Sequence, residues 1–180
     1  MADPTGHRKH MKQHFEMFAA YNRWANAAIY DAAAELGDDE RGRNLGAFFG
    51  SVTGTLNHML VADRIWMKRF TGEGDATGAL DAVLDTRLAK LRALREAEDK
   101  RIADWVGGLS DKALAGRFTY MTVTDMRTVS QRLAPALAHF FNHQTHHRGQ
   151  LHMMLTVLGG PSLPLDLIYF QRTEDGRRFA

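Results

Sequence analysis

Residues 139–151 read HFFNHQTHHRGQL and place four histidines within nine residues of one continuous helical pattern. An α-helix turns by about 100° per residue, so His143 and His147 lie one turn apart on the same face, and Gln150 follows one turn later. His139 extends this stripe by one turn in the other direction. The H-x-x-x-H spacing lets one helix give two nitrogen ligands to one metal ion.

Apolar residues surround most of this predicted helix, so the histidine stripe is not wholly exposed to solvent. They include Phe140, Phe141, Leu151, Met154 and Leu155. Histidines that enter a core must be satisfied by hydrogen bonds, by a carboxylate or by a metal ion. From this helix alone, a hydrogen-bonded core pair and a pair of metal ligands are both open interpretations.

The whole chain has 180 residues, of which 44% are hydrophobic and 24% are charged. These values are typical of a globular protein with one sizeable core. We therefore expect one domain over residues 1–180, with mobile ends at 1–9 and 174–180. The chain has no cysteine, so a metal site must use histidine, carboxylate and water, and a disulfide framework is excluded.

The charge and hydropathy patterns exclude two further classes of partner. The formal net charge is +2, and the basic residues are interleaved with acids without a helix-turn-helix or zinc-finger motif, so we expect no nucleic-acid partner. No apolar run approaches the roughly 20 residues that cross a bilayer, so we expect no membrane partner. The N-terminal residues lack the apolar centre of a signal peptide, and we predict a cytoplasmic location.

Hydrophobic periodicity predicts an all-α fold, a four-helix bundle with a long connection. The expected helices cover residues 10–36, 45 or 47–70, 80 or 84–106, and a last segment that follows Thr128 and ends at Gly159. Residues 38–46 and 71–78 are expected to be irregular connections. Residues 118–123 are rich in β-branched and aromatic side chains, which predicts a short extended segment or hairpin before the last helix. The apolar tail at 161–172 is expected to pack back on the bundle.

Small and polar residues within these helices suggest close packing between neighbours. Gly50 and Gly54 permit the close approach of another helix. Asn22 and Asn26 lie one turn apart beside Trp24, and we interpret them as forming hydrogen bonds between helices rather than as catalytic groups.

His58 is the histidine of the second predicted helix that can complete a metal site. It shares a face with Ala62 and Trp66, and a lone histidine on such a face is more commonly a satisfied core residue than a ligand. Metal sites in bundles, however, are built from residues on facing helices. With His143 and His147 it would give three imidazoles, which leave one or more positions open for water or substrate, as in catalytic sites. The ligand type does not choose among Zn, Ni and Fe.

Supporting roles can be suggested for several neighbours, although a structural role is the simpler interpretation of each. Gln150 and Asn142 are candidates for hydrogen bonds to the ligands, and Arg148 for a contact with an anion. His139 or His146 could carry a proton. No catalytic residue is assigned, and no organic cofactor is expected.

Four segments of the chain resemble the DinB family, the DinB/YfiT-like metalloenzymes. They read YNRWAN at 21–26, LNHMLVADRIW at 56–66, HQTHHRGQ at 143–150 and LDLIYF at 165–170, so the resemblance covers nearly the full length in order. The resemblance implies a four-helix bundle that is often a homodimer. It also implies a divalent metal ion held by a histidine triad, which falls here on His58, His143 and His147.

Characterised relatives of that family include transferases and isomerases that use low-molecular-weight thiols such as bacillithiol or mycothiol. The resemblance thus predicts a metal-dependent enzyme that transfers a low-molecular-weight thiol to a small electrophile or hydrolyses a small-molecule substrate. Two alternatives stay open. The chain could be a non-catalytic, stress-related bundle that binds a metal or small ligand, or a bundle whose histidines are core residues and whose function is assembly.

Overall fold

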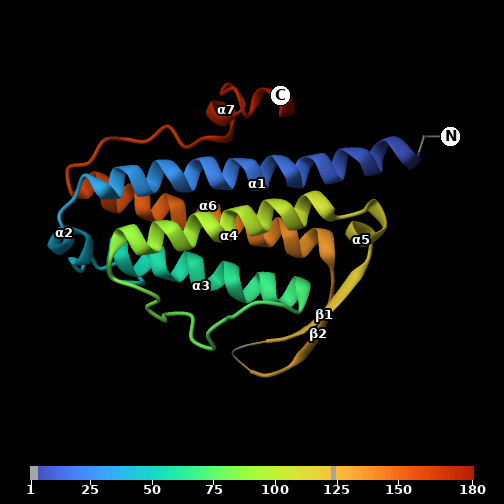
Figure 1. Cartoon of the computed structure of the whole chain (residues 1–180), viewed down its shortest axis with the longest axis horizontal. Helices are drawn as coiled ribbons and strands as arrows, with labels where there is room; N and C mark the ends of the chain where they lie inside the picture. Colours follow the sequence, from blue (N-terminus) through green and yellow to red (C-terminus); the bar gives the residue numbers. More distant parts are fainter. Residues whose placement is uncertain (1–3, 123–124) are drawn as a thin grey trace.

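The computed structural model describes residues 4–122 and 125–180, and this part of the chain is mostly helical (Figure 1). The four long helices are α1 (Pro4–Ala34), α3 (Val52–Thr71), α4 (Leu88–Gly108) and α6 (Leu133–Val157). The short helices are α2 (Asp38–Gly42), α5 (Asp111–Ala115), α7 (Leu167–Phe170) and the 3-10 helix η1 (Arg177–Phe179). The predicted all-α class is confirmed.

A small antiparallel hairpin precedes α6, as predicted. Its strands are β1 (Arg117–Met121) and β2 (Thr128–Arg132), and Arg117 pairs with Arg132 while Met121 pairs with Thr128. The predicted extended segment ended at Val123, which lies outside the described residues. Thr128, expected to lead into the last helix, instead begins the second strand.

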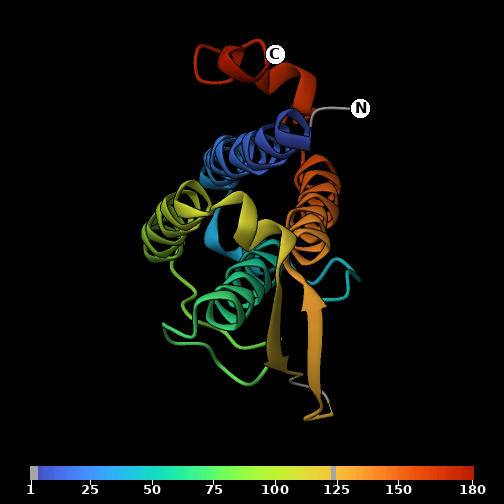
Figure 2. The same ribbon diagram turned by 90° about the vertical axis from the view of Figure 1, so that its right-hand side faces the viewer.

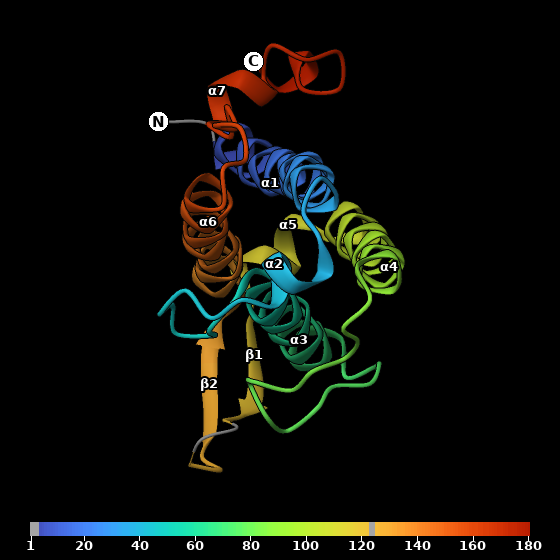
Figure 3. The same ribbon diagram turned by 90° about the vertical axis from the view of Figure 1, so that its left-hand side faces the viewer.

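The long helices form a bundle in which each packs against two neighbours. Viewed along the bundle, their order is α1, α4, α3 and α6, so that α1 and α3 both pack between α4 and α6 (Figures 2 and 3). The colours in Figure 1 show that α3 and α4 run in the same direction. Two parallel neighbours need a connection that returns along the bundle, and residues 72–87 provide the predicted long connection.

Two apolar clusters fill the bundle, one towards each end. The first contains Ile29, Leu60, Leu91 and Leu151, all of them buried. The second contains Met67, Ile102, Leu137 and Phe140, which are also buried. Burial of one such side chain contributes about 1.5–3 kcal/mol, so apolar packing between the helices accounts for most of the stability of the bundle.

A layer of buried polar residues separates the two apolar clusters, and every long helix contributes to it. Its members are Asn22 and Asn26 from α1, Asp63 from α3, Arg95 and Asp99 from α4, and Gln144 and Arg148 from α6. Arg95 donates to Asp63 at 2.7 Å and pairs with Asp99 at 3.0 Å. Asn26 donates to Asp99 at 3.1 Å. Because two acids and two arginines are present, the formal charge of the layer is balanced.

Helix α3 begins later than predicted, at Val52 rather than at 45 or 47. Gly50 has a φ of 74°, which ends the preceding loop in a left-handed conformation, and Ser51 caps the helix by accepting from the Gly54 N–H at 3.1 Å. A Cβ on Gly54 would lie 2.1 Å from the carbonyl oxygen of Phe49. Gly54 therefore makes room for the loop before its own helix, and the expected contact with another helix at this glycine is wrong.

Helix α4 also begins later than predicted, at Leu88 rather than at 80 or 84. The side chain of Asn57 on α3 accepts from the backbone N–H of Leu84 at 2.7 Å and of Asp85 at 3.2 Å, and it donates to the Asp85 carbonyl at 2.9 Å. If the helix began at residue 80, the N–H groups of Leu84 and Asp85 would bond to carbonyls within the helix, whereas here they bond to Asn57. They also fix the end of the 72–87 connection on α3.

The two ends of the chain differ in part from the sequence-based expectation. Helix α1 begins at Pro4 rather than at 10, and residues 38–42, expected to be irregular, form α2. The apolar tail packs back on α1 as predicted (Figure 2). Phe170 is fully buried there, against Tyr21 and Trp24 of α1. The mobility expected for residues 1–9 and 174–180 stays a prediction, and residues 1–3 lie outside the described part of the chain.

Candidate metal centre

Three histidines from two neighbouring helices meet at one point. His58 comes from α3, and His143 and His147 come from α6. The Nε2 atom of His147 lies 3.1 Å from the Nε2 of His58 and 3.1 Å from the Nε2 of His143. One nitrogen from each ring lies within 4.8 Å of the other two. The structure thus brings together all three residues that the sequence singled out as candidate ligands.

Helix geometry and the polar layer place these rings. His143 and His147 are one turn apart on the face of α6 that packs against α3. Gln144, the residue after His143, donates through Nε2 to the carboxylate of Asp63 on α3. This buried hydrogen bond lies beside the histidines and fixes the register of α3 against α6.

The hydrogen bonds of two rings define their tautomers. Nδ1 of His58 lies 2.8 Å from the carbonyl oxygen of Leu80, which can only accept, so Nδ1 carries the hydrogen. Nδ1 of His147 lies 2.8 Å from Oε1 of Gln150, so it also carries the hydrogen. In both rings Nε2 is therefore left with a lone pair, the form in which imidazole ligates a metal.

The lone pairs of His58 and His147 consequently face each other without a hydrogen between their Nε2 atoms. Two buried acceptors at 3.1 Å repel each other, and a polar group that is buried without a donor destabilises the fold. A divalent cation at the point where the Nε2 atoms converge would remove this cost. The donor set of three nitrogens, with no thiolate, fits zinc, nickel or iron(II).

Burial keeps the three imidazoles neutral. Desolvation lowers the pKa of His58, against the opposing effect of its bond to the Leu80 carbonyl. Desolvation, followed by the neighbouring histidines, lowers the pKa of His143 to about 3. Desolvation lowers the pKa of His147 to about 4, although its bond to Gln150 acts in the other direction. At neutral pH the three rings are therefore ready to bind a metal without first losing a proton.

Phe49 covers one side of the histidine group. Its ring stacks on His58 with a centroid distance of 3.6 Å and an interplanar angle of 15°, and it meets the edge of His147 at 5.7 Å. Neither Phe49 nor the Leu80 carbonyl was identified from the sequence. Both belong to segments that the sequence pattern assigned to the starts of helices and that are irregular in the structure.

The other residues suggested from the sequence have different positions. Gln150 bonds to His147, as expected of a residue that orients a ligand. His139 and His146 are exposed beside the site, and His146 accepts from Gln150 at 3.2 Å. Asn142 is exposed, and among the described residues its side chain forms no hydrogen bond.

Arg148 is fully buried and points into the polar layer, away from the histidines. It donates to Asn22 and to Thr145, and its guanidinium lies 5.0 Å from the ring centre of Tyr21. Its suggested role as an anion contact at the site is therefore wrong, and its function is to connect α6 with α1.

A sequence profile of the DinB family matches residues 11–178. Protein DinB of Bacillus subtilis (strain 168) is 26% identical over 162 residues, which cover 86% of this chain and 93% of that protein. Among the described helices, none contains a stretch long and apolar enough to span a bilayer.

Proposed function

The chain belongs to the DinB family, and on this premise we propose that it is an enzyme that depends on one divalent metal ion bound by His58, His143 and His147. The observation that carries the proposal is the convergence of three neutral imidazoles, among which the facing Nε2 lone pairs of His58 and His147 have no hydrogen between them. Zinc, nickel and iron(II) all suit such a ligand set. Three protein ligands leave room for a substrate group, which is typical of catalytic sites.

The proposed reaction is the transfer of a low-molecular-weight thiol to a small electrophile, with hydrolysis of a small substrate as the second candidate. A metal ion held here supplies Lewis acidity, which lowers the pKa of a thiol or of water at neutral pH. In the transfer, sulfur forms a bond to the electrophilic carbon, the leaving group departs with its electron pair, and the thiol proton passes to solvent. The homodimer and the cytoplasmic location expected from the sequence stay predictions.

The residues of the chain have distinct tasks in this proposal. The Leu80 carbonyl and Gln150 hold the hydrogens of His58 and His147 on Nδ1, so that Nε2 stays available. Phe49 excludes water from the face of His58 on which it stacks. The exposed ring of His139 lies beside His143 and that of His146 lies beside His147, so small molecules would reach the site from this side.

Elemental analysis tests the metal part of the proposal. The protein is purified without a histidine tag or a nickel column, together with His143→Ala and with His14→Ala, which removes an exposed histidine on α1. We expect near-stoichiometric metal in the wild type and in His14→Ala, and little in His143→Ala. A wild type that neither contains nor takes up zinc, nickel or iron would refute the proposal.

Turnover by the metal-loaded protein tests the enzymatic part. Glutathione and cysteine serve as thiols, and 1-chloro-2,4-dinitrobenzene serves as an electrophile that releases chloride when the thioether forms. We expect a rate above the uncatalysed reaction that is lost in His143→Ala. Stoichiometric metal without turnover of any member of a wider panel of thiols and electrophiles would instead favour a binding protein.

A further inference from the structure

A row of rings and one guanidinium continues from the histidine triad along the seam between α3 and α6. The ring of His139 lies 6.1 Å from that of His143, and the ring of Trp66 lies 5.1 Å from that of His139. The guanidinium carbon of Arg69 lies 4.6 Å from the ring centre of Trp66 and 4.8 Å from that of Tyr120. The row therefore connects the candidate metal centre with the hairpin.

The fold explains why these residues share one line. Trp66 follows His58 by two turns of α3 on the same face, and Arg69 follows about one turn later. His139 precedes His143 by one turn of α6, which runs antiparallel to α3. Strand β1 lies against α3 (Figures 2 and 3). Its Tyr120 ring meets Trp66 at 5.5 Å at the far end of the row.

Arg69 has no anionic partner within the part of the chain that the structure describes. Its guanidinium lies beside two adjoining aromatic rings, Trp66 and Tyr120, whose centres are 5.5 Å apart, and its Nε is buried without an acceptor. Nε is also unpaired in the fully buried Arg95 and Arg148, but each of these donates from another nitrogen, to Asp63 and to Asn22. Desolvation lowers the pKa of Arg69, although a guanidinium stays charged at neutral pH. Nε is closed to solvent, so an anion would bind the terminal N–H groups of Arg69, for which the described residues likewise provide no acceptor.

Solvent reaches this row. Trp66, Arg69 and Tyr120 are half-buried, and His139 is exposed. Trp66, which lies between His139 and Arg69 in the row, supplies the apolar side chain between the triad and the guanidinium. A guanidinium that neighbouring aromatic rings hold in place binds carboxylates well, because its planar N–H groups match the two carboxylate oxygens.

We propose that this row is the distal half of the substrate site, and that the substrate carries a carboxylate that Arg69 binds while its other end reaches the histidine triad. The apolar middle of the substrate lies across Trp66. This inference rests on the proposed metal-dependent function, and it specifies the substrate class: a small organic anion, with a metal-binding group at one end and a carboxylate at the other.

A matched pair of thiols tests the inference. The protein is loaded with Co²⁺, whose visible spectrum reports thiolate binding, and is titrated under argon with 8-mercaptooctanoic acid and with 8-mercaptooctan-1-ol. The two probes have the same length and differ only in the terminal carboxylate. We expect the acid to bind about tenfold more tightly than the alcohol, since a hydrogen bond to a charged group contributes at least this factor.

Two substitutions and one control identify the residue responsible. Arg69→Met keeps the apolar stem over Trp66 and should make the two affinities equal, whereas Arg69→Lys should keep part of the preference. Lys68→Met removes a positive charge from the exposed neighbour and should leave the preference intact. Circular dichroism confirms that each variant is folded.

The outcomes separate this inference from the proposed function. Equal affinities in the wild type, or a preference that survives in Arg69→Met, would overturn the inference while cobalt binding still supports the metal centre. If cobalt binds and neither thiol changes its spectrum, the inference fails as well. If the wild type binds no cobalt, the proposed function fails, and this inference fails with it.

Discussion

The Nε2 atoms of His58 and His147 lie 3.1 Å apart, and neither ring has a hydrogen to place between them, because each donates from Nδ1 to another acceptor. A proton could bridge the two rings, but burial lowers the pKa of both. A divalent cation satisfies the lone pairs without requiring a charged imidazole. The contact therefore predicts that the protein is more stable with metal than without it.

The first prediction concerns this gain in stability. At a free zinc concentration of about 100 times Kd, binding should stabilise the fold by about 2.7 kcal/mol, or roughly 5–10 °C in Tm for a chain of this size. Differential scanning fluorimetry of protein stripped with EDTA and then titrated with Zn²⁺ measures the shift. His147→Ala should lose the shift, and His14→Ala should keep it. An equal shift in both variants would place the bound metal elsewhere.

The second prediction concerns the residue that orients His147. Gln150→Ala removes the acceptor of the Nδ1 hydrogen, which frees the ring to rotate and to change its tautomer. Loss of such a partner typically costs about 10–100-fold in metal affinity. Competition with a chromophoric zinc chelator measures the change. Asn142→Ala, an exposed position on the same helix, is the matched control and should leave the affinity unchanged.

The third prediction concerns pH. The pKa values of His143 and His147 are lowered to about 3 and about 4, whereas both rings titrate near their ordinary value of about 6.5 in the unfolded chain. As pH falls below about 6.5, the unfolded state gains protons that the folded state does not take up. The stability contributed by these groups is therefore complete above this pH and is lost progressively towards pH 4.

Urea unfolding of the metal-free protein at several pH values between 7.5 and 4.5 measures this loss in stability. The unfolding midpoint should fall with pH in the wild type and fall less steeply in His143→Ala, which lacks one of the titrating rings. Parallel pH profiles for the two proteins would show that other groups cause the acid sensitivity.

The helices and the grouping of the three histidines could be predicted because they follow from local periodicity. His143 and His147 are one turn apart in any α-helix, and a bundle must place some other helix against their face. The interhelical hydrogen bonds expected of Asn22 and Asn26 are confirmed, since both donate to Asp99.

Features that depend on bonds between distant segments could not be predicted. Helix α4 begins late because Asn57 binds the backbone of residues 84 and 85, and no pattern within residues 80–88 indicates this. Phe49 covers His58 because a loop folds over the start of α3. Arg148 is buried because three other helices supply its polar surroundings, whereas its neighbours in sequence suggested a role at the site.

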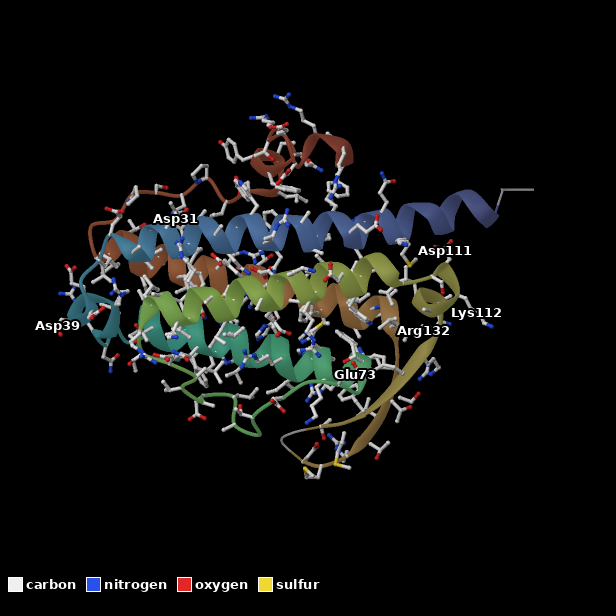
Figure 4. All side chains as sticks on the ribbon, viewed as in Figure 1. Asp31, Asp39, Glu73, Asp111, Lys112 and Arg132 are labelled. Atoms are coloured by element: carbon white, nitrogen blue, oxygen red, sulfur yellow. The ribbon has the colours of Figure 1, made fainter. Side chains whose placement is uncertain are left out.

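The fourth prediction concerns the polar layer. Asp63 is 1% exposed and accepts from both Arg95 and Gln144. Asp63→Ala therefore leaves the charge of the buried Arg95 with Asp99 as its remaining anionic partner in the layer. Removal of one partner from a buried pair typically costs about 3–5 kcal/mol. Chemical denaturation measures the loss, which should far exceed that of Asp31→Ala. Asp31 lies at the surface of α1 (Figure 4). It is paired there with Arg92, and surface ion pairs contribute about 0–1 kcal/mol.

The last prediction concerns Gly54, whose missing side chain lets the loop approach α3. A Cβ there would lie 2.1 Å from the Phe49 carbonyl oxygen, so Gly54→Ala must displace the loop that holds Phe49 on His58. We expect lower stability and weaker zinc binding, measured by denaturation and by chelator competition. Gly149→Ala on α6 is the control, because a Cβ there meets nothing within 4 Å and should stabilise the helix by up to about 1 kcal/mol. If Gly54→Ala behaves like this control, Phe49 does not contribute to the site.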